Sequence, residues 1–204
     1  MRRLAWRAVR LLAFSDIHRD LRQAAAIAER AADADVVVAA GDFGSLHRGV
    51  AELIDMLVVI ETPTVLVPGN NETDDELREA CAGWRAAHVL HGDGVEIDGV
   101  SFWGLGAGIP TTPWPWSFDL DEEEAEAALR SCPPELDVMV LHSPPRDHLD
   151  GDRSLGSQAL LAGLERVQPR VAVWGHIHED AGKETRVGAT RGFNLGPEGR
   201  WIEL

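Results

Sequence analysis

Cysteine is scarce in this chain, and long hydrophobic runs are absent from it. The two cysteines, Cys81 and Cys132, are too few for a disulfide framework, and neither belongs to a Cys-x-x-Cys pattern. No apolar run approaches the roughly 20 residues that a membrane-spanning helix needs. We therefore interpret both cysteines as reduced thiols and predict a cytoplasmic protein that does not enter a membrane.

Basic residues are also few. The chain has 19 Lys and Arg against 34 Asp and Glu, a formal net charge of −15. This balance argues against binding nucleic acid or an anionic membrane through a broad basic surface. The N-terminus is locally basic, but the apolar stretch Leu11–Phe14 that follows is too short for a signal peptide. An anionic substrate would need positive charge from a local source.

The order of elements indicates an α/β fold. The 204 residues contain no internal repeat, low-complexity tract or interior linker, so we predict one domain over residues 1–204. Apolar, β-branched runs alternate with segments of helical periodicity, which is typical of layered α/β proteins. Strands are predicted at 9–15, 36–40, 64–67 and 137–141, and helices at 21–32, 48–60, 74–82, 121–131 and 158–167. Short strands between 87 and 103 suggest an antiparallel meander, and residues 201–204 a last strand.

One irregular segment, residues 104–118, is rich in glycine, proline and tryptophan. It contains the sequence Trp-Pro-Trp at positions 114–116. Aromatic side chains in such a loop either wall a binding pocket or cover part of the core. The sequence leaves both interpretations of Trp114 and Trp116 open.

Metal-binding residue types follow several of the predicted strands. Ligands in α/β sheets bind just beyond the carboxyl ends of strands. An apolar run from Val171 ends at Gly175 and leads to His176 and His178, which would point to one side if the backbone were extended. The complete set of strand-end candidates is Asp16, His18, Asp42, Asn70, His142, His176 and His178.

The order of these residues resembles the signature of the calcineurin-like metallophosphoesterases. The resemblance runs from about residue 14 to 179. Its motifs are Asp16-x-His18, Gly41-Asp42, Gly69-Asn70-x-Glu72, His142 and Gly175-His176-x-His178. It implies a four-layer α/β/β/α sandwich of two mixed β-sheets flanked by helices.

The resemblance also implies a dinuclear metal centre. Asp16, His18 and His178 would bind one ion. Asn70, His142 and His176 would bind the second, and Asp42 would bridge the two. Carboxylate and imidazole ligands suit Mn, Fe, Zn or Ni, with the identity left open. Two divalent ions would give an otherwise acidic protein a local positive charge.

The implied reaction is hydrolysis of a small phosphoester substrate by a hydroxide bound at the two metals. The catalytic candidates are Asp42, Asn71 and His142. Many members of the family have histidine where this chain has Asn71, and an amide cannot deliver a proton near neutral pH. We therefore predict a phosphodiesterase, or an enzyme for esters with good leaving groups, rather than a phosphomonoesterase.

Other proton donors and other functions remain open from the sequence. His47, His91 and His148 are possible replacements for the missing histidine, and Arg146 or His148 could contact a phosphate. A non-catalytic, metal-binding interaction scaffold of the same fold is one alternative function. A nuclease is another, although the net charge of −15 argues against it.

Overall fold

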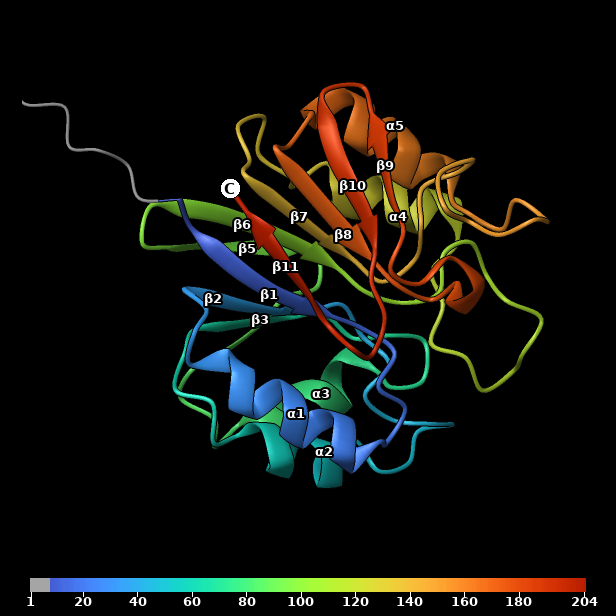
Figure 1. Cartoon of the computed structure of the whole chain (residues 1–204). Coiled ribbons are helices and arrows are strands. Elements are labelled where there is room, and N and C mark those ends of the chain that lie inside the picture. Colours follow the sequence, from blue (N-terminus) through green and yellow to red (C-terminus); the bar gives the residue numbers. More distant parts are fainter. Residues whose placement is uncertain (1–7) are drawn as a thin grey trace, which may run out of the picture.

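Two mixed β-sheets form the centre of the protein in the computed structural model, which describes residues 8–204 (Figure 1). Residues 1–7, part of the segment considered above as a signal peptide, lie outside the described residues. The first sheet has the order β11 (Arg200–Glu203), β1 (Arg10–Phe14), β2 (Val36–Ala39), β3 (Thr64–Leu66) and β4 (Ala87–Val89). The second has the order β5 (Asp93–Ile97), β6 (Val100–Leu105), β7 (Val138–Leu141), β8 (Val171–Trp174), β10 (Thr190–Asn194) and β9 (Glu184–Val187).

Helices cover the outer face of each sheet. The first sheet is covered by α1 (Leu21–Ala31), α2 (Val50–Leu57) and α3 (Asp74–Cys81). The second is covered by α4 (Glu122–Leu129) and α5 (Gln158–Val167). Figure 1 shows the sheets face to face between these two helical layers, which confirms the predicted four-layer sandwich. Across residues 8–204, no helix is both long enough and apolar enough to span a membrane.

The β-branched runs form strands that are buried on both faces. In β2, Val36 and Val38 pack into the core between the sheets, whereas Val37 packs beneath the helices. Adjacent strand residues point to opposite faces, so a strand between two apolar layers must be apolar at every position. This explains why these segments are continuous hydrophobic runs in the sequence.

Polar caps fix where several helices begin. The Asp20 side chain caps α1 by accepting hydrogen bonds from the backbone N–H groups of Arg22 and Gln23. Thr73 and Glu76 form a reciprocal capping box at the start of α3. The caps therefore fix the chain direction as it leaves the loops after β1 and β3.

The prediction of an antiparallel meander between residues 87 and 103 was correct for β5 and β6 but wrong for β4. β4 pairs in parallel with β3 at the edge of the first sheet, while β5 and β6 pair antiparallel in the second sheet. α3 returns the chain beside β3, which completes a parallel β-α-β crossover. Local turn signals mark where these strands end, but they do not say which sheet each strand joins.

Candidate metal centre

The strand-end residues singled out in the sequence lie together at one edge of the sandwich. Loops after β1, β2 and β3 come from the first sheet, and loops after β7 and β8 come from the second. Within each sheet these strands run parallel to one another, so their carboxyl ends lie on one side. Both sheets therefore contribute side chains to the same site.

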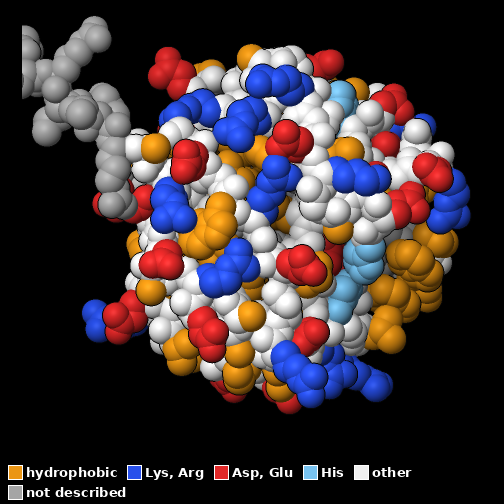
Figure 2. Space-filling model, in the orientation of Figure 1, with side chains coloured by type: hydrophobic (Ala, Val, Ile, Leu, Met, Phe, Trp, Pro, Cys, Tyr) orange, Lys and Arg blue, Asp and Glu red, His pale blue; other side chains and the backbone are white. Residues whose placement is uncertain are grey.

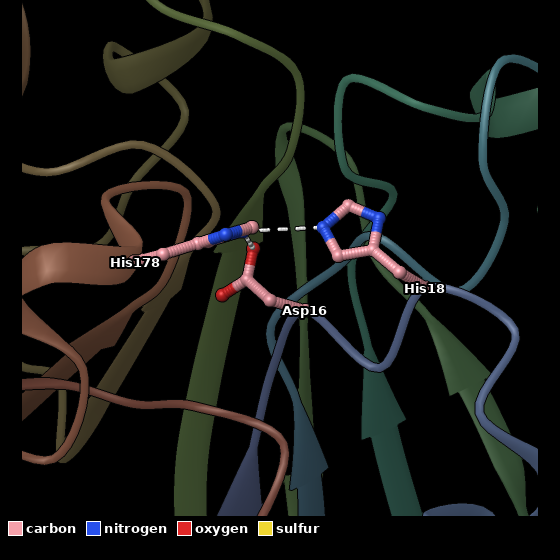
Figure 3. A group of neighbouring side chains, drawn as sticks. All are labelled: Asp16, His18 and His178. Atoms are coloured by element: carbon pink, nitrogen blue, oxygen red, sulfur yellow. Dashed lines mark hydrogen bonds and ion pairs between the residues drawn. The ribbon is translucent and has the colours of Figure 1, made fainter.

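Asp16, His18 and His178 form the first cluster, here called the Asp16 group. One ligand atom from each lies within 4.8 Å of the other two. The Nε2 atom of His178 is 3.5 Å from Asp16 Oδ1 and 3.2 Å from His18 Nε2. Figure 3 shows the two imidazole rings on either side of the Asp16 carboxylate. Two imidazoles and a carboxylate facing one point are a suitable donor set for a divalent transition metal.

Asp42, His142 and His176 form the second cluster, here called the His142 group, whose ligand atoms also lie within 4.8 Å of one another. Asn70 adds its amide oxygen, which is 3.3 Å from His142 Nε2 and 3.1 Å from His176 Nδ1. The Asn70 amide nitrogen donates to Ser117 Oγ, so the amide oxygen faces the histidines.

Asp42, a member of the His142 group, also faces the Asp16 group. Its Oδ2 is 3.4 Å from His18 Nε2, and its Oδ1 is 3.6 Å from His142 Nε2. The carboxylate is almost fully buried, with 2% of the residue exposed. A carboxylate with one oxygen toward each cluster has the placement that a bridging ligand requires.

The backbone at the site has left-handed conformations that L-residues rarely adopt. The φ angles are 56° at Asp16, 44° at His18, 60° at Asp42 and 66° at His176. Such strain occurs where the surrounding structure demands a particular side-chain direction. The extended backbone assumed for His176 and His178 was therefore wrong, because the chain turns at His176 and enters a 3-10 helix, His178–Asp180. This turn sends the two imidazoles into different groups.

Glycine precedes several of these residues for a steric reason. A Cβ on Gly175 would collide with Asp16 Oδ2, and a Cβ on Gly69 would collide with Asp42 Oδ1. A Cβ on Gly41 would come within 2.6 Å of His142 Nδ1. The Gly-Asp, Gly-Asn and Gly-His pairs in the sequence therefore reflect how closely the loops pack around the ligands.

The electrostatics of the site favour the cation-binding protonation states of Asp16 and His176. In contrast, the pKa of His142 is raised despite its burial by the charges of Asp42 and Asp16, and the Asp16 hydrogen bond raises the pKa of His178. Burial alone raises the pKa of Asp16, but the His178 hydrogen bond, the charge of His142 and the Ser15 hydrogen bond lower it to about 2. Burial and the charge of His142 lower the pKa of His176 to about 4. Asp16 is therefore ionised and His176 neutral at pH 7, as metal coordination requires. The residues present fit two divalent ions.

Glu72 supports the site from beneath. It is fully buried, and its carboxylate accepts hydrogen bonds from the backbone N–H groups of Asp42, Gly44 and Gly69 at 2.9, 3.0 and 2.6 Å. Burial and the charge of Asp42 raise the pKa of Glu72 to about 7. Glu72 thus ties the loop after β2 to the loop after β3. The sequence marked it as part of a motif but did not indicate this contact.

Asn71 binds Asp42 directly. Its side-chain amide nitrogen donates to Asp42 Oδ2 at 2.9 Å, and its backbone N–H donates to Asp42 Oδ1 at 2.9 Å. Its amide oxygen accepts from the Leu46 N–H. Asn71 therefore holds the Asp42 carboxylate in place.

A cavity of about 380 Å³ opens over both groups. Its lining includes Asn71, Trp114 and Trp116, so these tryptophans form part of the pocket wall. Arg153 also lines it, and sequence reasoning missed this residue because nothing in its loop distinguishes it from a solvated arginine. None of His47, His91, His148 and Arg146 is among the lining residues. His47 instead contacts Glu76 and the Trp116 carbonyl.

Comparison with known proteins identifies related sequences and folds. The protein UPF0046 K07C11.7 of Caenorhabditis elegans is 29% identical over 200 residues, covering 85% of this chain, and the chain spans 65% of that protein's length. The structure of TT1561 from Thermus thermophilus has a TM-score of 0.79 at 18% identity, covering 94% of this chain and 91% of that one. An archaeal phosphodiesterase structure has a TM-score of 0.52 at 18% identity, and the match covers 96% of this chain and 99% of that one. At these identities the structural likenesses establish the fold alone.

The family assignment rests on a match to a family model. Residues 9–180 match the model of the calcineurin-like phosphoesterase family, and this range includes both metal-binding groups and the loops that carry them. The chain belongs to the calcineurin-like phosphoesterase family.

Proposed function

We propose that this protein is a metal-dependent hydrolase that cleaves a phosphodiester, or a phosphoester with a good leaving group, in a small substrate. The observation that carries the proposal is the pair of His/Asp groups linked by the buried Asp42 carboxylate, beneath an open cavity. Such a pair suits two ions that act together on one phosphate. Manganese as the metal in the cell and a cytoplasmic location are parts of the same proposal.

The roles of the residues follow from their positions. One ion would be held by Asp16, His18 and His178. The other would be held by Asn70, His142 and His176, and Asp42 would be a ligand to both ions. When bound, two divalent ions supply positive charge for the phosphoryl oxygens and lower the pKa of water enough to provide a nucleophile. Asn71 and Glu72 hold Asp42 in position, and Arg153 adds a cation to the cavity wall.

The preference for good leaving groups rests on what lines the cavity. Its histidines, His18, His176 and His178, all belong to the two metal groups. Arg153 cannot release a proton near neutral pH, and the Asn71 amide already donates to Asp42. Apart from Asp42, the acid in the lining is Glu179, whose Oε1 accepts a hydrogen bond from the Asp152 N–H. No group in this lining is poised to protonate a departing alkoxide.

Asn71→His tests this explanation. We expect the variant to raise turnover of an alkyl phosphoester relative to a p-nitrophenyl ester by about 10-fold or more, because a positioned acid contributes about 10²–10⁴-fold. Steady-state kinetics with both substrates gives the ratio. Asn71→Ala is the matched control, since it removes the contact with Asp42 without adding an acid. An unchanged ratio in Asn71→His would contradict the stated cause of the preference.

The same assays separate the enzyme from its alternatives. Metal-loaded protein that hydrolyses neither bis(p-nitrophenyl) phosphate nor a panel of nucleotides would favour the interaction scaffold. Salt-dependent binding of single- or double-stranded DNA would favour a nuclease, against which the net charge of −15 weighs.

A further inference from the structure

Two tryptophans and a leucine give the cavity an apolar wall beside the metal-binding groups. The rings of Trp114 and Trp116 are stacked, with centroids 5.6 Å apart and planes inclined by 12°. Trp114 is 48% exposed and Leu155 is 44% exposed, and both line the cavity. Figure 2 shows histidine side chains at the surface next to a projecting group of hydrophobic side chains. Apolar surface that stays in water contributes nothing to folding, so packing of the core does not explain these side chains.

The loop that carries the tryptophans is tied to the metal-binding groups. Asn70 donates through its side chain to Ser117 Oγ at 2.8 Å, and its carbonyl accepts from the Phe118 N–H at 3.0 Å. The Trp116 carbonyl contacts the His47 ring. On the other side of the tryptophans, Thr112 donates twice to Asp119, at 2.7 and 2.8 Å. The loop is therefore held by hydrogen bonds on both sides of the stacked rings, and a bound ring would not have to order it.

We propose that this wall is a subsite for a planar aromatic group carried on the ester oxygen that does not leave. The inference rests on the proposed function and deepens it by naming the substrate class. The exposed Trp114 ring offers a π-face for stacking, and Leu155 offers a second apolar surface. Arg153 and the ligand groups in the same cavity suit the attached phosphate. A nucleobase and a simple aryl ring are both planar aromatic groups that could stack in this way.

Three p-nitrophenyl phosphodiesters test the subsite, because they share a leaving group and differ in the other ester group. These are the methyl, phenyl and thymidine 5′ esters. We expect kcat/KM for the phenyl or thymidine ester to exceed that for the methyl ester by about tenfold or more, as base stacking on an aromatic side chain typically provides. The ratio of kcat/KM for the thymidine ester to kcat/KM for the phenyl ester identifies which ring is preferred. Equal kcat/KM for all three esters would overturn the proposal.

Variants at Trp114 test whether the preference for aromatic esters comes from the apolar wall of the cavity. Trp114→Ala should reduce the aromatic-to-methyl ratio by about tenfold, whereas Trp114→Phe should retain most of it because a ring remains. Val59→Ala is the control, since Val59 is 68% exposed and does not line the cavity. If Trp114→Ala folds and keeps the wild-type ratio, the subsite is refuted.

A binding measurement separates the failure of the subsite from the failure of the proposed function. Thymidine 5′-monophosphate should quench tryptophan fluorescence of the metal-free wild-type protein, and should quench Trp114→Ala markedly less. Ribose 5-phosphate, which has no ring to stack, should quench neither. If wild-type protein hydrolyses none of the three diesters, the proposed function fails, and the fluorescence titration alone decides the subsite. Equal quenching of the wild type and Trp114→Ala would then overturn it.

Discussion

Replacing Asp42 by alanine is expected to abolish tight binding of both metal ions and to lower phosphodiester hydrolysis by about 10²–10³-fold or more. The two carboxylate oxygens face different groups, at 3.4 Å from His18 Nε2 and 3.6 Å from His142 Nε2. Loss of one side chain therefore removes a ligand from each site. Metal content by mass spectrometry and kcat/KM for bis(p-nitrophenyl) phosphate measure the two effects.

Two further variants show whether the effect of Asp42→Ala is specific. His178→Ala removes a ligand from the Asp16 group alone, so it should lower occupancy of one site more than the other. Asp55→Ala removes an exposed carboxylate on α2 and should leave metal content and activity at wild-type levels. Two tightly bound ions per chain in Asp42→Ala would show that this carboxylate does not bridge them.

Adding one methyl group at Gly69 is expected to damage the site almost as severely as replacing Asp42 by alanine. The Cβ of Gly69→Ala would collide with Asp42 Oδ1 and the Asp42 backbone nitrogen, and would lie 2.7 Å from Asp42 Cγ. Either the carboxylate or the loop after β3 must move. Movement of the loop is opposed by the hydrogen bond that the Gly69 N–H donates to Glu72. We expect loss of metal binding, about 10²-fold lower activity and about 1–3 kcal/mol lower free energy of unfolding, because overpacking also destabilises.

Gly83→Ala is the matched control for this substitution. It adds the same methyl group where no heavy atom lies within 4 Å of the new Cβ. Denaturant unfolding and metal titration of both variants separate general stability from damage to the site. Wild-type metal affinity in Gly69→Ala would mean that the loop relaxes without moving Asp42, contrary to the close packing described here.

The sequence marked the candidate metal ligands that the fold brings together because their signal is local. Each follows an apolar run, and the carboxyl ends of parallel strands meet at one edge, so the run alone places Asp42 or His142 near the site. The partition of strands between two sheets was not predictable in this way. The pairing of β4 with β3 depends on how α3 packs, which is a property of the whole chain.

Contacts made by irregular loops were also outside what the sequence could predict. The donation from Asn71 to Asp42 depends on the conformation of the loops that carry them, and Asp42 itself has a φ of 60°. The turn at His176, which sends His176 and His178 to different groups, is left-handed in a residue that seldom adopts this conformation. Arg153 reaches the cavity from a loop without periodicity, so no pattern marked it.

The most direct test of a dinuclear phosphoesterase centre is the metal content of wild-type protein, measured together with its activity. Purified protein would be stripped, reconstituted separately with Mn²⁺, Ni²⁺, Zn²⁺ and Mg²⁺, and assayed with phosphomonoester and phosphodiester substrates. The two groups predict two ions per chain with at least one transition metal, and diester hydrolysis that depends on them. Less than one ion per chain after reconstitution, with no hydrolysis of any ester, would contradict the dinuclear centre.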